Sequence, residues 1–162
     1  SEDNTLLASG SWDFAARIWN LETGKLVAGP FKGIDFVGAV RFSTDSKKLA
    51  VRSDAKTIYE FDASTLETVG TPFTGHTEIV RGLALSFDSA FLASASHDDT
   101  IKLWAFESRQ LLASFDTVGT PFEGHTKGIS GLALSFDGAL LASASMDDTI
   151  KLWAFESRQL LA

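Results

Sequence analysis

The sequence contains no cysteine, which excludes a disulfide framework and a thiolate metal site. It has no apolar run of about 18 residues, so no membrane-spanning helix is predicted. Basic residues are also few, because 14 lysines and arginines face 21 acidic residues and the formal net charge is −7. A general nucleic-acid binder needs a basic face. We therefore expect neither nucleic acid nor a membrane as a partner.

Apolar and aromatic side chains, in contrast, are plentiful. Hydrophobic residues make up 44% of the 162 residues and include 13 phenylalanines, which is enough for one domain with a sizeable core. The first residues are polar and do not form a signal peptide, so a cytoplasmic location is expected. A start without methionine, in the middle of a motif, is typical of a processed, excised or engineered piece.

The most regular stretch is residues 75–104, in which short apolar segments are separated by polar turns. Apolar residues alternate with small or polar ones through 83–87, a period typical of a half-buried strand. Residues 91–96 and 100–104 predict two further strands, joined by a tight turn at 97–99. Short strands with turns every 8–12 residues predict an all-β sheet unit.

Nearly the same amino-acid sequence is repeated 49 residues later. Residues 117–162 match 68–113 at 38 of 46 positions. The differences are Thr74/Glu123, Glu78/Lys127, Ile79/Gly128, Val80/Ile129, Arg81/Ser130, Ser89/Gly138, Phe91/Leu140 and His97/Met146. A repeat of this length in an all-β sequence predicts propeller blades, each a four-stranded sheet.

Less exact copies precede this pair. The predicted blades are 1–33, 34–74, 75–123 and 124–162, within one propeller domain. An offset of 85 aligns Ser1 with Ser86, so the first blade is predicted to lack its inner strand. The strands predicted in the first two blades are 5–11, 15–20, 25–31, 38–43, 48–53, 57–62 and 67–73. Six extra residues between blades three and four lie within 114–121, where we expect a bulge or a long loop.

The order of motifs carries a family resemblance. Gly-His, a hydrophobic strand, Leu-Ala-Ser-Ala-Ser, an aspartate turn and Thr-Ile-Lys-Leu-Trp follow one another in 75–104 and again in 124–153. In this the chain resembles the WD-repeat (WD-40) β-propeller family. The resemblance implies an all-β propeller of about four WD-type blades. Because propellers generally have four to eight blades, we expect the chain to be half of an eight-bladed ring.

The resemblance also implies a buried hydrogen-bond relay in each regular blade, from a tryptophan indole through serine and histidine to aspartate. The predicted members are His76, Ser94 or Ser96, Asp98 and Trp104, with the copies His125, Ser143 or Ser145, Asp147 and Trp153. Physically, a buried indole N–H needs an acceptor, and an imidazole held by a carboxylate is satisfied on both nitrogens. Blade two has Ile34 in place of the histidine and Phe61 in place of the tryptophan, so the network should be absent there.

The same serine, histidine and aspartate residues could instead belong to a hydrolase. A structural role is favoured, because the set recurs in two blades and no Gly-x-Ser-x-Gly nucleophile elbow is present. The turn His97-Asp98-Asp99 is interpreted as a polar turn rather than a metal site, since Met146 replaces its histidine in the copy. We therefore predict no catalytic residue, no metal and no cofactor.

The differences between the two copies cluster at one rim of the predicted blades. Five of the eight fall at positions 78–81 and 97, where a strand is entered and just before the network aspartate. Loops carry binding chemistry while a scaffold stays fixed, so these positions are candidate partner contacts. Neutral drift at exposed positions explains the pattern almost as well. The predicted rim residues are Trp12, Phe36, Glu78, Arg81, His97, Lys127, Ser130 and Met146.

The leading hypothesis for function is a non-enzymatic scaffold that binds an unknown protein or peptide. Blades bury their faces only against neighbours, so the terminal blades should expose apolar faces and favour a homodimer that closes the ring. One alternative is an engineered or duplicated structural fragment with no ligand. The other alternative is the hydrolase.

Overall fold

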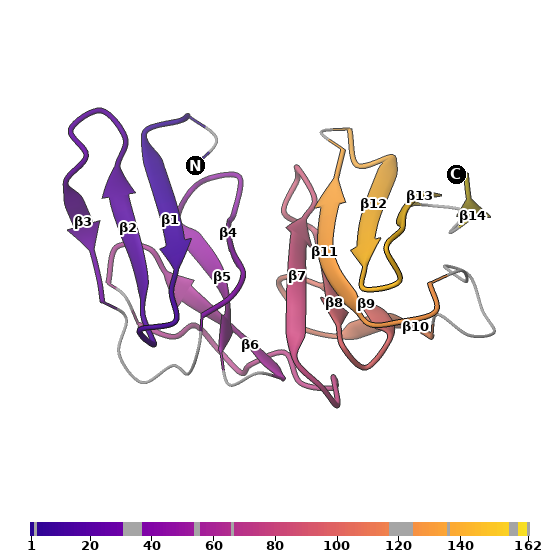
Figure 1. The fold of residues 1–162 in the computed structure, drawn as a ribbon. Coiled ribbons are helices and arrows are strands. Elements are labelled where there is room, and N and C mark those ends of the chain that lie inside the picture. Colours follow the sequence, from indigo (N-terminus) through magenta and orange to yellow (C-terminus); the bar gives the residue numbers. More distant parts are fainter. Residues whose placement is uncertain are drawn as a thin grey trace. The chain divides into compact units, whose positions relative to one another are not determined.

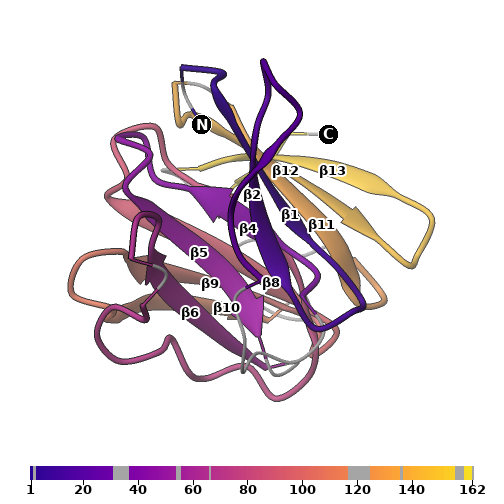
Figure 2. The ribbon, with the colours of Figure 1, turned by 90° about the vertical axis from the view of Figure 1, so that its left-hand side faces the viewer.

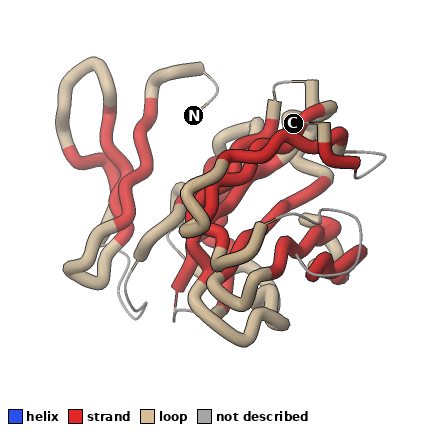
Figure 3. The backbone as a smooth tube through the Cα atoms, turned by 45° about the vertical axis from the view of Figure 1, so that its right-hand side comes forward, coloured by secondary structure: helices blue, strands red, loops and turns tan. Residues whose placement is uncertain are grey.

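The computed structural model consists of strands and turns, and none of the described residues is helical (Figures 1 and 3). The described residues are 1, 3–30, 37–53, 56–65, 67–116, 125–135, 137–155 and 159–161. Within them there is accordingly no helix that could span a membrane. The strands are β1 (Leu6–Gly10), β2 (Ala16–Asn20), β3 (Leu26–Ala28), β4 (Val40–Phe42), β5 (Lys48–Ser53), β6 (Thr57–Asp62), β7 (Val80–Leu85), β8 (Phe91–Ser96), β9 (Thr100–Ala105), β10 (Leu111–Asp116), β11 (Ile129–Leu134), β12 (Leu140–Ser145), β13 (Ile150–Ala154) and β14 (Gln159–Leu160).

These strands form four antiparallel sheets in chain order, each a meander in which a strand pairs with the next (Figures 1 and 2). The first sheet is β1-β2-β3 and the second is β4-β5-β6. The third sheet is β7-β8-β9-β10 and the fourth is β11-β12-β13-β14. The chain divides into two compact units, Ser1–Gly75 and His76–Ala162, with two sheets in each. The prediction of an all-β chain of blade-like sheets is confirmed.

One predicted strand is wrong, because residues 67–73 do not form a continuous fourth strand of the second sheet. Only isolated bridges join Thr68 to Phe61 and Phe73 to Ile58. Between them Pro72 has no amide hydrogen to donate to a ladder, and Gly70 has a positive φ of 63° that interrupts the extended backbone. β3 is also shorter than predicted, and residues 117–121 of the expected loop lie outside the described residues.

A turn of the same construction precedes β1, β5, β8 and β12. In the third sheet Ser86 Oγ donates to Asp88 Oδ1 at 2.6 Å and accepts the amide of Phe91 at 2.9 Å. This hydrogen bond from the serine lowers the pKa of Asp88. The equivalent pairs are Ser1–Asp3, Ser43–Asp45 and Ser135–Asp137. The residue after each aspartate has a left-handed backbone, with φ from 56° to 70°, at Asn4, Ser46, Ser89 and Gly138. A serine-aspartate clamp thus sets the start of one strand in every sheet.

The two faces of each sheet carry different residues, because side chains alternate along a strand. We call the face with the strand tryptophan, such as Trp104, the back face, and the opposite face, with residues such as Ile101, the front face. In the second unit the front face of the third sheet packs against the back face of the fourth, in one core that joins Ile101 to Trp153. In the first unit a similar core joins Ile18 of the first sheet to Leu49 of the second.

Glycine allows the closest approach in the second unit, where β7 lies beside β11 (Figure 1). A Cβ atom added to Gly82 would lie 2.8 Å from the amide nitrogen of Leu132 and 3.0 Å from the carbonyl carbon of Gly131. Gly131 occupies the same position in the fourth sheet, and a Cβ atom there would meet nothing within 4 Å. One glycine is required by a neighbouring backbone, and its copy is not.

We expect Gly82→Ala to lower the free energy of unfolding by about 1–3 kcal/mol, because β7 and β11 must separate to admit the methyl group. Gly131→Ala is the matched control and should be neutral or slightly stabilising, since alanine loses less chain entropy than glycine on folding. Urea unfolding of both variants checks this. Equal midpoints for the two variants would contradict the close packing of these strands.

Candidate functional site

The third sheet contains a chain of buried polar side chains on its back face. Trp104 Nε1 donates to Ser94 Oγ at 2.8 Å, and the same oxygen lies 2.7 Å from His76 Nε2. His76 Nδ1 lies 2.8 Å from Asp98 Oδ2. Ser94 is fully buried, and the side chains of His76 and Asp98 are 1% and 7% exposed. The indole of the third strand is thereby connected to the turn before it.

The hydrogens of this network can be placed from its chemistry. Ser94 Oγ accepts the indole N–H and has one hydrogen of its own to donate to His76 Nε2; with that arrangement Nδ1 carries the hydrogen that is donated to Asp98. The carboxylate of Asp98 also accepts from Thr100 Oγ1 at 2.5 Å and from the amide of Thr77 at 2.9 Å. A neutral imidazole with its hydrogen on Nδ1 therefore satisfies every group.

The charge of Asp98 is held by these donors. Burial alone would raise the pKa of Asp98, but hydrogen bonds from His76, Thr100 and the amide of Thr77 outweigh it. The pKa of this carboxyl group consequently lies well below its usual range.

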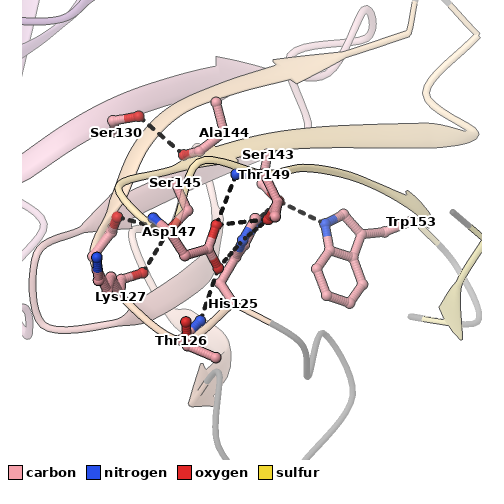
Figure 4. Close-up of polar contacts among 11 residues, drawn as sticks. His125, Thr126, Lys127, Ser130, Ser143, Ala144, Ser145, Asp147, Thr149 and Trp153 are labelled. Carbon is pink, nitrogen blue, oxygen red and sulfur yellow. Dashed lines mark hydrogen bonds and ion pairs between the residues drawn. The ribbon is translucent and has the colours of Figure 1, made fainter.

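The fourth sheet repeats the network (Figure 4). Trp153 Nε1 donates to Ser143 Oγ at 2.8 Å, and that oxygen lies 2.8 Å from His125 Nε2. His125 Nδ1 lies 3.0 Å from Asp147 Oδ2. Burial again acts to raise the pKa of Asp147, and donors led by the Thr149 hydroxyl hold it well below its usual range.

The two serines of each predicted pair have different partners. Ser94 and Ser143 belong to the relay, whereas Ser96 Oγ donates to the carbonyl of Glu78 at 2.9 Å and accepts the amide of Asp98 at 3.1 Å. In the fourth sheet Ser145 Oγ donates to the carbonyl of Lys127 at 2.7 Å (Figure 4). The second serine therefore ties the turn before the aspartate to the loop that enters the sheet.

The first sheet has a reduced version of the network, and the second sheet lacks its tryptophan and serine. Trp19 Nε1 donates to Ser9 Oγ at 2.8 Å, while Asp13 pairs with Arg17 at 2.7 Å. In the second sheet Phe61 and Val51 take the positions of Trp104 and Ser94. Replacing donor and acceptor together by apolar groups leaves neither unsatisfied, which explains how this sheet dispenses with the network.

Sequence reasoning missed an ion pair of a buried glutamate in the second sheet. Glu60 is buried, and its Oε1 lies 3.2 Å from Lys48 Nζ. A glutamate where the third sheet has Leu103 was the available signal. This pair lies on the front face rather than in the network.

The predicted rim residues lie mostly at the surface. Trp12 and Met146 take the same turn position in the first and fourth sheets and are 79% and 54% exposed. Exposed charged or polar side chains occupy four further predicted positions, Glu78, Arg81, Lys127 and Ser130. Phe36 lies outside the described residues.

Phe14, in the same turn as Trp12 between β1 and β2, is an exposed aromatic residue that sequence reasoning missed. It is 51% exposed and has a φ of 67°, in the position that Asp99 and Asp148 take in the third and fourth sheets. A bulky residue in the left-handed region is unusual, whereas aspartate is tolerated there. The signal was the dipeptide Asp-Phe where the regular copies have Asp-Asp.

His97 differs from the other rim residues because it packs between sheets. Arg81 Nε donates to its Nε2 at 3.2 Å. A Cβ atom on Gly128 would lie 3.2 Å from both Cα and Cδ2 of His97, so a side chain there would crowd the imidazole. The differences Ile79/Gly128 and His97/Met146 are therefore coupled by packing.

Comparison with known proteins places the chain in a family. The WD40 family (WD domain, G-beta repeat) matches residues 1–20, 66–105 and 115–154, well over half of the chain. The chain belongs to the WD-repeat family. Among described residues, no group of three or more histidine, aspartate or glutamate side chains is arranged to hold a metal ion.

Curated relatives are WD-repeat proteins of greater length. Protein SPA1-RELATED 3 of Arabidopsis thaliana is 35% identical over 105 residues, which are 64% of this chain and 12% of that protein. Autophagy-related protein 16 of Arabidopsis thaliana is 28% identical over 99 residues, 60% of this chain and 19% of that protein. Actin-interacting protein 1 of Drosophila melanogaster is 31% identical over 116 residues, 71% of this chain and 17% of that protein. The chain spans less than a fifth of these three, and the family implies a general role as a protein-interaction scaffold.

For this WD-repeat chain we expect Asp98→Ala to lower the free energy of unfolding by about 1–3 kcal/mol, because buried donors lose their acceptor. Asp147→Ala should behave alike. The control is Asp99→Asn, which changes an exposed neighbour and keeps a residue that tolerates a left-handed backbone. Denaturation midpoints measure the effect, and unchanged midpoints in both alanine variants would refute the role of the network.

The network also predicts an acid-dependent stability. Because the folded chain holds the pKa of Asp98 below its ordinary value of about 3.9, it binds fewer protons than the unfolded chain, and stability rises with pH in the window below about pH 4. Urea midpoints should fall as pH is lowered from 5 to 2. Asp98→Asn should flatten this fall by at most about 1.4 kcal/mol per pH unit. Parallel curves for the variant and the parent would contradict this assignment.

Proposed function

We propose that the chain is a non-enzymatic interaction module that binds a protein or peptide through its rim residues. The observation that carries this proposal is the exposure of Trp12 and Met146 at the same turn position of two sheets. Aromatic residues and methionine are enriched in protein interfaces. Phe14 adds a second exposed aromatic ring beside Trp12, on a backbone that disfavours it.

The buried network supports this role by fixing the rim. Asp98 accepts the amide of Thr77, and Ser96 donates to the carbonyl of Glu78, so the entering loop and the turn are joined. Arg81 donates to His97 across the same region. Rigid support under a variable surface is the arrangement expected of a binding loop.

The burial of Ser94 argues against the hydrolase alternative. Its Oγ is fully buried and already accepts the indole N–H of Trp104, so no substrate can reach it. Ser143 is in the same situation, with 1% of its surface exposed. The constellation stabilises the sheet, and no catalytic role is proposed for it.

A structural module without a ligand is the second candidate function. It is favoured by the identity of the copies at 38 of 46 positions. It is also favoured by the contact of His97 with Gly128, which accounts for two of the copy differences without any partner. Apolar side chains are exposed on the first and fourth sheets, for example Leu7 at 50% and Ile150 at 76%, and on this ground we propose that two copies of the chain associate.

Exchanging exposed rim residues should change which protein is captured. We expect Glu78→Lys with Arg81→Ser, which install the residues of positions 127 and 130, to alter the proteins recovered from a lysate. Trp12→Ala should lower the affinity of the chain for a recovered partner by about tenfold or more, as expected for an aromatic residue that anchors an interface. Affinity capture followed by mass spectrometry measures both effects.

The control for this experiment is Val27→Ser, an exposed apolar residue in β3 that lies away from the rim positions. It should leave capture unchanged. All variants should keep the free energy of unfolding, measured by urea denaturation, within about 0.5 kcal/mol of the parent, as usual for surface substitutions. Binding that survives every rim variant, or the recovery of no partner, would favour the structural module.

A further inference from the structure

We infer that two copies of this chain bind head to tail, with the front face of the fourth sheet in one copy against the back face of the first sheet in the other. This inference rests on the proposed self-association and adds the two faces and their residues. It is argued from a contact that already exists inside the chain, between the third and fourth sheets.

That internal contact serves as a template. The front face of the third sheet contributes Ile101 and Ala95, which are 1% and 0% exposed. The back face of the fourth sheet covers them with Leu141 and Trp153, both 0% exposed. At the edge of the contact the rings of Phe91 and Phe155 lie 6.4 Å apart. The alanines around Ile101 on the front face of the third sheet thus leave room for the larger Leu141 and Trp153 of the fourth sheet.

The front face of the fourth sheet repeats five of these residues, and none of the described residues covers it as the fourth sheet covers the third. Its members are Ala133, Ala142, Ala144, Ile150 and Leu152, identical to Ala84, Ala93, Ala95, Ile101 and Leu103 of the third sheet. Ile150 is nevertheless 76% exposed, whereas Ile101 is 1% exposed. At these five positions the two faces therefore differ only in what lies against them, and the covered face shows what the open face can accept.

The back face of the first sheet offers the required side chains. Leu7 takes the position of Leu141 and is 50% exposed, and Trp19 takes the position of Trp153 and is only partly buried. Leu21, also 50% exposed, takes the position of Phe155. These residues are apolar at the positions where the template is apolar, and no described residue buries them as the third sheet buries those of the fourth.

The edge pair of the template has a counterpart with matched size. Where Phe91 meets Phe155 inside the chain, Leu140 of one copy would meet Leu21 of the other. Both positions change from phenylalanine to leucine, so the pair stays apolar and fills less space at the edge of the contact.

The contact between copies is smaller than its template. In the internal contact β11 contributes Ile129 and Leu132, and the described part of the first sheet has no strand beyond β1 to supply their equivalents. Only middle and outer strands take part, so the association should depend on concentration in the micromolar range. A closed two-copy arrangement uses each face once in each chain.

Mass measurement across concentration tests the faces. Sedimentation equilibrium should give about twice 17.4 kDa at high concentration. Ile150→Asp should weaken association at least about tenfold, because it places a charge in the apolar contact. The control is Phe87→Asp, an exposed residue in the turn after β7, which should leave association unchanged. Equal association by all three chains would overturn the assigned faces while leaving self-association intact.

Cross-linking tests the direction of the contact. Because the sequence has no native cysteine, only the introduced cysteines can react. Single variants Leu21→Cys and Leu140→Cys are mixed and treated with a short bismaleimide. A dimeric product is expected from the mixture and not from either variant alone. A product from Leu140→Cys alone would mean that two fourth sheets meet, and would overturn the head-to-tail contact.

Two further outcomes decide against the inference. A double variant, Leu21→Cys with Leu140→Cys, that is bridged within one chain at nanomolar concentration would show that the two faces meet inside a single copy. A mass of one chain at every concentration would overturn both the assigned faces and the proposed self-association. Retention of partner capture by such a monomer would leave the rim function standing, so the two proposals fail separately.

Discussion

The structure depends on the need of a buried indole N–H for an acceptor. Burying Trp104 gives the third sheet a large apolar ring for its core, yet it also buries a donor that must be satisfied. Ser94 accepts the indole N–H, His76 contacts Ser94, and the carboxylate of Asp98 ends the network at the turn. Packing of the strands and the shape of the turn are thereby linked, since neither can change without leaving a buried group unpaired.

The second sheet shows what happens when this constraint is removed on both sides. With Phe61 and Val51 there is no donor and no acceptor, and the sheet keeps a core without the network. Its serine-aspartate clamp, Ser43 with Asp45, is unchanged. The clamp and the network are therefore independent devices, and only the network connects the inside of the sheet with the rim.

Much of the fold could be predicted from sequence, because repeats, alternation and turn residues are local signals. The network members could be predicted from the family resemblance, but the choice between Ser94 and Ser96 could not. Both serines face the same way, two residues apart, and only their distance from the indole separates them. The interrupted outer strand of the second sheet was missed because strand propensity outweighed Pro72. The packing of His97 could not be foreseen, since its neighbour belongs to another copy.

The contact between His97 and Gly128 has a consequence for how such a chain can grow. Each repeat carries a projecting group at its second turn and a space at its entrance, and the two must suit each other across a junction. If isoleucine, the residue at position 79, stood at position 128, its Cβ would lie 3.2 Å from Cα and Cδ2 of His97, so the turn that contains His97 would have to shift by a few tenths of an ångström. The two copies are nearly identical in sequence, yet they cannot exchange places in the chain without a change in packing at this junction. The order of the two copies therefore depends on one pair of residues, His97 and Gly128. A further duplicated block would need a residue at its entrance that fits the turn of the block before it.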